Sequence, residues 1–85
     1  MKKVNFKEIV IKDIEGREQK VDVSQLLGNQ LYMEGQNIEE CELGKRIYFA
    51  TGEVELSETE IKVVKRFAQN CYYVMRTAIE DAIKV

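Results

Sequence analysis

The sequence contains no histidine, proline or tryptophan and only two cysteines, Cys41 and Cys71. Histidine is the side chain that most often acts as a general base near neutral pH, so catalysis would need a carboxylate or lysine with a strongly shifted pKa. Zinc binding would need closely spaced cysteines or histidines, which the chain lacks. The five glycines stand singly and form no phosphate-binding loop. We therefore expect no metal, no cofactor and no enzymatic activity.

The two cysteines themselves fall among apolar positions of separate predicted helices. This placement favours ordinary buried thiols, because free cysteine packs as a small apolar residue. A redox role is the alternative, and it would require an exposed, electropositive setting around the thiol.

Targeting and membrane-spanning segments are also missing. The opening M-K-K resembles the start of a secretory signal, but Asn5, Lys7, Glu8 and Lys12 interrupt the apolar stretch that such a signal requires. No apolar run approaches the length needed to cross a bilayer. We expect a cytoplasmic protein without membrane contact.

The length and charge of the chain fit one small domain over residues 1–85. With 85 residues, 45% of them hydrophobic, the chain lies near the lower limit for a self-sufficient core. Its 13 basic and 15 acidic residues give a net charge of -2 and no overall attraction to nucleic acid. Because no disulfide framework supports the fold, stability must come from packing, and association with another chain would add to it.

The first part of the chain predicts a β-hairpin. Residues 4–12 are rich in β-branched and aromatic residues, and D-I-E-G and then R-E-Q-K-V-D-V follow them. Gly16 would supply the positive φ that the turn requires. An isolated two-stranded sheet is marginal in water, so a helix or another strand must cover this one.

A short helix is predicted next, over residues 25–34, with Ser24 as its N-cap and Gly35 as its end. Gly28 lies inside this helix, where glycine costs about 1 kcal/mol relative to alanine. It marks either a close contact with another helix or a bend.

The second helix is predicted to open at Asn37, since Glu40 three positions later completes a capping pattern, and to run to about Ala50. The E-V-E-L segment at residues 53–56 alternates acidic and apolar residues. It fits either a third strand or an extended tether, and we favour the tether.

The last third of the chain gives the clearest pattern. Ser57-Glu58-Thr59-Glu60 has the form of a capping box. Apolar residues then recur at steps of three and four, which predicts one long amphipathic helix over residues 57–85. The predicted order is ββααα, an α+β domain with its hairpin separate from its helices.

This last helix has more apolar surface than a domain of this size needs. At about 27 residues it would be about 40 Å long, whereas a compact chain of this length is about 30 Å across. Its second apolar flank could be covered by the rest of the chain, by a second copy or by another protein, and we favour a homodimer because closed two-fold dimers are the commonest assemblies. The expected interface residues are Ile61, Val64, Phe67, Ala68, Cys71, Tyr72, Met75, Ala78, Ile79 and Ala82.

The opposite face of the same helix carries a basic strip that could follow a phosphate backbone. The strip consists of Lys62, Lys65, Arg66, Tyr73 and Arg76. Glu80 and Asp81 lie at its far end and the whole chain is acidic, so a solvated face is favoured over a nucleic-acid surface. No helix-turn-helix spacing supports DNA binding.

Two stretches, V-D-V-S-Q-L-L-G-N-Q-L-Y and L-G-K-R-I-Y-F-A-T-G-E-V-E-L-S-E-T-E, resemble small proteins of unknown function encoded by bacterial phages and prophages. The similarity covers residues 20–66 and consists of caps and turns, so it transfers no functional residue. The resemblance implies a host-cytoplasm setting and a role in virion assembly or regulation.

The working hypothesis is a non-enzymatic protein-interaction module that forms a homodimer, or binds another protein, through its last helix. The alternative is a nucleic-acid-binding regulator that uses the basic strip.

Overall fold

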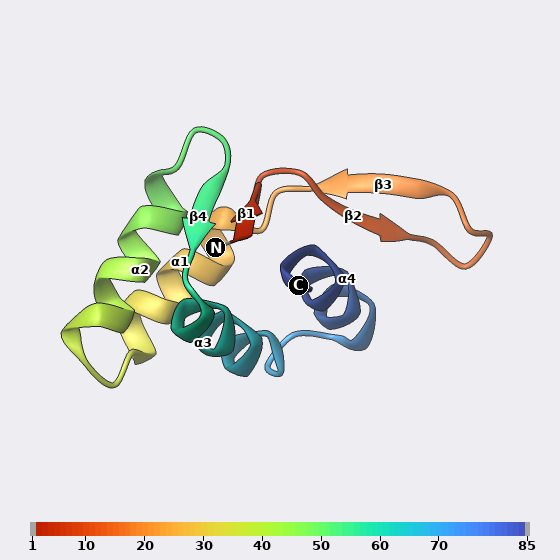
Figure 1. Ribbon diagram of the computed structural model, residues 1–85. Helices are drawn as coiled ribbons and strands as arrows, with labels where there is room; N and C mark the ends of the chain where they lie inside the picture. The colour runs from red at the N-terminus through yellow and green to blue at the C-terminus, as the bar shows by residue number, and fades with distance from the viewer. Residues whose placement is uncertain (1, 85) are drawn as a thin grey trace.

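The computed structural model describes residues 2–84. The elements in chain order are β1 (Lys2–Val4), β2 (Ile9–Lys12), β3 (Glu18–Val21), α1 (Ser24–Glu34), α2 (Ile38–Phe49), β4 (Val54–Leu56), α3 (Glu58–Ala68) and α4 (Tyr73–Ile83). Two small antiparallel sheets, β1 with β4 and β2 with β3, combine with the helices (Figure 1). The α+β class is confirmed. The ββααα order is wrong in detail, because a strand precedes α3 and the last helix is divided in two.

The predicted first strand is interrupted by a turn. The Glu8 N–H donates to the Asn5 carbonyl oxygen and the Lys7 N–H donates to the Asn5 side chain, so the backbone turns between β1 and β2. Phe6 lies in this turn and is buried in the core, and its carbonyl oxygen accepts from the Val23 N–H. This turn explains why residues 4–12 show no regular alternation of apolar and polar residues.

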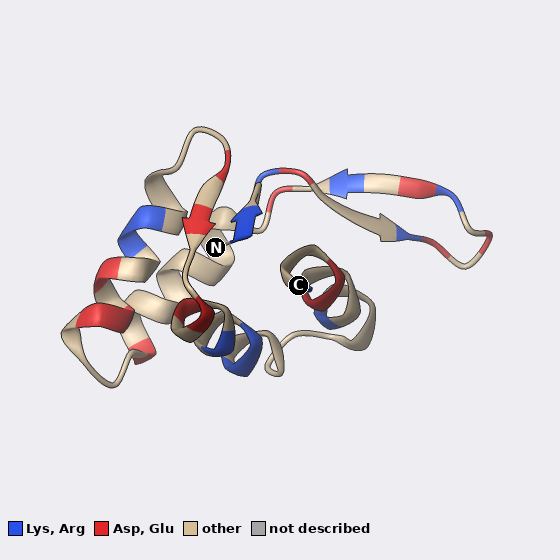
Figure 2. Cartoon of the chain, viewed as in Figure 1, with Lys and Arg blue, Asp and Glu red and all other residues tan. Residues whose placement is uncertain are grey.

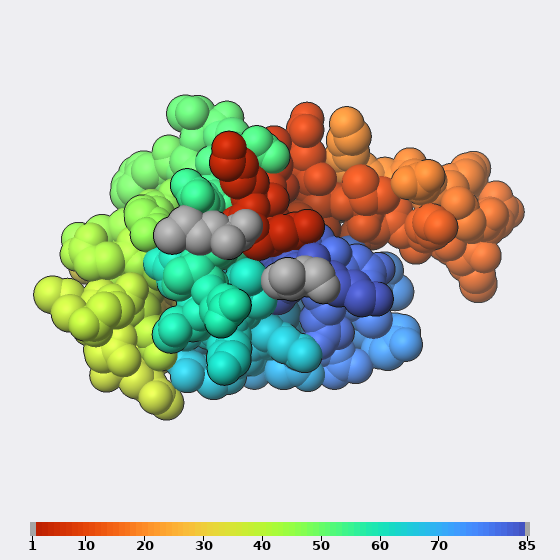
Figure 3. Space-filling model, in the orientation of Figure 1, coloured from red at the N-terminus to blue at the C-terminus, as the bar shows by residue number. Residues whose placement is uncertain are grey.

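The hairpin of β2 and β3 is confirmed, with Gly16 at φ 83° in its turn. The Asp13 carboxylate organises the turn by accepting from the N–H groups of Glu15 and Arg17. The base of the hairpin lies beside α4 (Tyr73–Ile83), and its tip reaches beyond the rest of the molecule (Figures 1 and 3). This projection accounts for the long dimension of the molecule, 41 Å against 22 Å in the other two directions.

Residues 53–56 were expected to form a tether, and this expectation is wrong. Val54–Leu56 form β4, which pairs antiparallel with β1 so that Glu55 lies opposite Lys3. The side chains of Val54 and Leu56 point into the core, and Glu55 is exposed. The partner strand lies near the other end of the chain, so the local pattern could not show the pairing.

The α1 and α2 helices form a closely packed pair. Gly28 of α1 lies against the backbone of α2 at Gly44, where a side chain on either residue would collide with the other helix. Close contact is therefore the role of Gly28, and α1 continues through this residue without a break. Gly44 has the same role inside α2, and it is a second glycine in a helix interior.

The prediction that Ser24 is the N-cap of the first helix is wrong. The helix begins at Ser24 itself, without a side-chain cap at Val23. Asp22 instead accepts from both the N–H and the hydroxyl of Ser24, at 2.9 Å and 2.6 Å. The caps of the later helices are confirmed, since Asn37 accepts from the Glu40 N–H and Ser57 forms a complete capping box with Glu60.

The single long helix predicted over residues 57–85 is wrong. The chain leaves the helical path after Ala68, where the N–H groups of Gln69, Asn70 and Cys71 bond to carbonyls three residues back. Tyr72 then adopts an extended ψ of 154° before α4 starts. Asparagine, cysteine and tyrosine are weak helix formers. The break lets α4 fold back toward α3 and lie along β1 and β2, so that the apolar flanks assigned to one helix belong to two.

The core is continuous through the described chain. Strands β1, β2 and β4 contribute Val4, Ile9 and Leu56, and each helix adds at least two buried apolar side chains. The last helix supplies Ala78, Ile79 and Ile83, and it packs against β1 and β2. The strand-bearing side of the molecule is therefore closed by α4.

Candidate interaction surfaces

Most of the predicted interface residues contribute to the core of their own chain. Val64, Phe67, Ala68, Ala78 and Ile79 are buried. Ile61, Cys71, Met75 and Ala82 are half-buried and pack against the core. Tyr72 alone is open, with 92% of its surface exposed. The buried members cannot line an interface between folded chains, which leaves the region around Tyr72.

Tyr72 belongs to an exposed apolar region where the α3–α4 junction meets α1. Leu26 and Met33 of α1 line the same hollow, of about 720 Å³, as Cys71, Tyr72 and Met75. We call these five residues the corner patch. Its polar neighbours are mostly uncharged, with Asn29, Gln30, Asn70 and the acidic Glu34 around it.

The α1 side of the corner patch could have been found in the sequence. Leu26 and Met33 are seven positions apart and therefore lie on one helix face, separate from the face of Leu27 and Leu31. The structure buries Leu27 and Leu31 completely and leaves Leu26 and Met33 exposed. A second apolar stripe on a short helix was the available signal.

The basic strip is divided by the break between α3 and α4. Lys62, Lys65 and Arg66 lie on α3, whereas Tyr73 and Arg76 lie on α4. Arg76 is placed over the Tyr73 ring, 5.2 Å from its centroid, and Arg66 is engaged in an ion pair. The five residues therefore do not follow one helix face. Acidic and basic residues also alternate over much of the molecule (Figure 2).

The partner of Arg66 is Glu40, which links α2 to α3. Arg66 Nη2 lies 2.6 Å from Glu40 Oε1, and the same carboxylate oxygen accepts from the Gln36 N–H at 3.0 Å. Although Glu40 is only 7% exposed, these donors keep its pKa below the ordinary value, the Gln36 N–H being the larger cause. No local pattern in the sequence predicts this contact, because Glu40 and Arg66 lie 26 positions apart.

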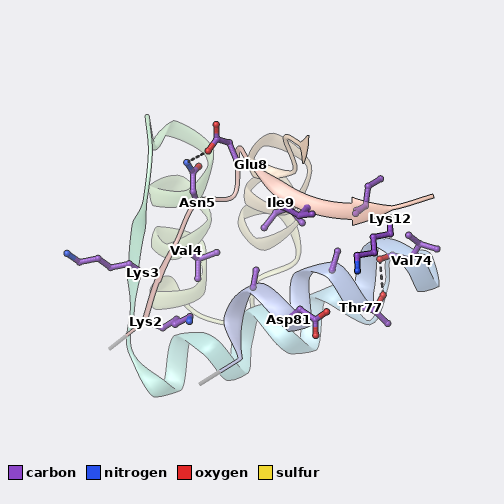
Figure 4. Close-up of a pocket in the computed structure, with 14 residues that line it drawn as sticks. Lys2, Lys3, Val4, Asn5, Glu8, Ile9, Lys12, Val74, Thr77 and Asp81 are labelled. Carbon is purple, nitrogen blue, oxygen red and sulfur yellow. Dashed lines mark hydrogen bonds between the residues drawn. The ribbon is translucent and has the colours of Figure 1, made fainter. Parts of the chain in front are cut away.

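A second surface runs between the hairpin and the last helix. A groove of about 640 Å³ follows residues 2–5 and 8–12 on one side, with Val74, Thr77, Ala78 and Asp81 of α4 on the other. Figure 4 shows β2 lying above α4, with Lys12 near Val74 and Thr77 at one end and Lys2 near the other. We call this feature the edge groove. Of the residues that line it, only Ala78 and Ala82 belong to the interface set predicted from the sequence.

The two thiols do not form a reactive pair. Both Cys41 and Cys71 are free and half-buried. The Cys41 thiol donates to the Tyr32 carbonyl oxygen at 3.5 Å. Burial raises the pKa of the Cys71 thiol, which disfavours the nucleophilic thiolate. These surroundings favour the interpretation that both cysteines are ordinary packing residues over a redox role.

Among residues 2–84, no helix is long and apolar enough to cross a membrane. The same residues contain no group of three or more potential metal ligands placed to hold an ion. Comparison with models of known protein families, with curated proteins and with solved structures finds no match to this chain. Function must therefore be argued from the surfaces themselves.

Proposed function

We propose that the protein is a non-enzymatic interaction module that self-associates through the corner patch. The observation that carries the proposal is the exposure of three large apolar side chains around one hollow. Leu26 is 61% exposed, Met33 76% and Tyr72 92%. Contiguous apolar surface of this kind marks sites of protein contact, and a two-fold axis through the patch would bury it against an identical copy.

The patch contains part of the interface that the sequence predicted. Cys71, Tyr72 and Met75 belong to the predicted set, and α1 adds Leu26 and Met33. Two flexible methionines lie next to an aromatic ring, a combination that adapts readily to a partner surface. The proposed role is that of a small cytoplasmic assembly or regulatory factor. Its phage-type setting rests on the resemblance of residues 20–66 alone.

Sedimentation equilibrium tests the proposal directly. At about 100 µM, the wild-type protein is expected to show twice the 9.9 kDa mass of one chain. Met33→Glu places a charge in the patch and is expected to give the single-chain mass. Ile38→Glu is the matched control, since Ile38 is 71% exposed but lies outside the hollow.

A wild-type mass of 9.9 kDa at that concentration would overturn self-association. Equal dimerisation of Met33→Glu and the wild type would overturn the placement in the corner patch. Circular dichroism of each variant separates loss of association from loss of fold.

The alternative, a nucleic-acid-binding regulator, has weaker support from the geometry. Its residues, from Lys62 to Arg76, are divided between two helices, and the Arg66 guanidinium already binds Glu40. No observation among the described residues favours it over the corner patch.

A further inference from the structure

The edge groove follows the main chain of β2 rather than one of its faces. All four residues of Ile9–Lys12 line it, although the side chain of Ile9 is buried and that of Val10 is exposed on the opposite side of the strand. Successive side chains of a strand point to opposite faces, so a groove that touches every residue runs along the strand's edge.

The free edge of β2 presents unused backbone groups. The Asp13 N–H donates to the Arg17 carbonyl oxygen, which fixes the alternation of the ladder between β2 and β3. Residues 9 and 11 then face β3, and the N–H and C=O groups of Val10 and Lys12 point away from it. Within residues 2–84, β2 has no strand partner other than β3.

The rest of the groove selects what could pair with this edge. On the α4 side, the small side chains of Thr77 and Ala78 line the groove beside the strand. Three lysines, Lys2, Lys3 and Lys12, line the groove against the two carboxylates of Glu8 and Asp81. None of these five charges belongs to an ion pair within the described chain.

One strand of the molecule already has the acidic, alternating pattern that would complement the lysines of the groove. β4 and the residue before it read E-V-E-L, and this acidic, alternating segment pairs with β1 so that Glu55 lies opposite Lys3. Strand β1, which carries Lys2 and Lys3, thus already pairs with an acidic strand in this fold.

We propose that the edge groove binds an extended acidic peptide segment of another protein, which adds to β2 as an antiparallel or parallel strand. Main-chain hydrogen bonds to Val10 and Lys12 would provide affinity, and alternate apolar side chains would pack on α4. Lysines near both ends of the groove would select carboxylates on the peptide. This site is separate from the corner patch and does not depend on self-association.

Fluorescence polarisation with a labelled peptide of repeated Glu-Val tests the proposal. We expect saturable binding, and at least about tenfold weaker binding of the matching Lys-Val peptide. Amide shifts in an NMR titration are expected along residues 2–12 and α4, with little change in α2. No binding of the Glu-Val peptide at about 1 mM, equal binding of both peptides, or shifts located elsewhere would overturn the proposal.

Paired variants then locate the contact. Lys12→Glu is expected to weaken binding at least about fivefold, whereas Lys20→Glu, the same change on β3 outside the groove, should alter it by less than about twofold. Val10→Pro removes an N–H that β3 does not use and should abolish binding. Lys20→Pro, at the position opposite Val10, is its control. Equal effects of the Lys12→Glu and Lys20→Glu variants would contradict the assignment even if the proline variants failed to fold.

Discussion

Gly28 and Gly44 meet backbone to backbone where α1 crosses α2. A Cβ atom added to Gly44 would lie 2.6 Å from the Gly28 carbonyl oxygen, and one added to Gly28 would lie 2.7 Å from the Gly44 carbonyl oxygen. Neither obstacle is a side chain that could rotate away. The separation of the two helices is therefore set by the absence of both side chains.

Gly28→Ala is expected to destabilise the protein by about 2 kcal/mol or more, since a clash with backbone forces the helices apart. Helix propensity alone would predict a gain of about 1 kcal/mol from the same change. Urea unfolding measures the difference. Gly52→Ala is the control, because no atom lies within 4 Å of the added Cβ, and it should change stability little. A stabilised Gly28→Ala variant would contradict the close crossing.

The contact of Glu40 with Arg66 predicts a particular pH dependence. The folded state holds the pKa of Glu40 below the ordinary value of 4.5, so its contribution to stability is present above that pH and is lost as the pH falls through the lowered pKa. Glu40→Gln should cost about 1 kcal/mol at pH 7. The difference from wild type should shrink below pH 4.5.

Denaturant unfolding at several pH values checks this dependence. Glu39→Gln, an exposed neighbour, is the matched control. The pKa values of Asp13 and Asp22 are also lowered by hydrogen bonds, chiefly from Arg17 and Ser24, so some acid sensitivity should persist in every variant. A constant gap between wild type and Glu40→Gln from pH 7 to acid would show that the charge of Glu40 is not involved.

The capping box at the start of α3 gives a third prediction. Ser57→Ala removes the hydroxyl that accepts from the Glu60 N–H at 3.2 Å, and the expected loss is about 1 kcal/mol. Thr59→Ala changes an exposed residue in the same turn that makes no such bond, and it should be nearly neutral. Thermal unfolding of both variants measures the contrast. Equal losses of stability in the two variants would mean that water replaces the Ser57 hydroxyl as the acceptor for the Glu60 N–H.

Cys71 should alkylate slowly in the folded protein. Burial raises the pKa of its thiol, so less thiolate is present at pH 8 than on an exposed cysteine, and access is restricted. Mass spectrometry after iodoacetamide treatment is expected to show labelling at Cys71 at least about tenfold slower than in urea. Labelling of the folded protein at the unfolded rate would mean that the α3–α4 junction opens readily.

Local signals in this sequence predicted local structure well. The turn at Gly16, the caps at Asn37 and Ser57 and the short helices are all confirmed. Each of these depends on residues a few positions apart, so a window of sequence contains the cause.

The larger errors concern contacts between distant segments. The pairing of Val54–Leu56 with β1 depends on residues at the far end of the chain. The break at Asn70 is favoured because α4 then buries Ile79 and Ile83 beside β1 and β2, a gain that the helical periodicity of residues 57–85 could not reveal. The predicted interface set contains Cys71, Tyr72 and Met75 of the corner patch. It lacks the two α1 residues, because Leu26 and Met33 join Tyr72 only after the chain folds.

The fold-back of α4 has a consequence for synthesis. Phe6 and Ile9 emerge from the ribosome well before Ile79 and Ile83, the side chains of the helix that closes this side of the core. Contacts between such distant segments form slowly. Ile9 therefore stays without its cover from α4 until synthesis has passed Ile83, and this side of the core is open to chaperone capture until then.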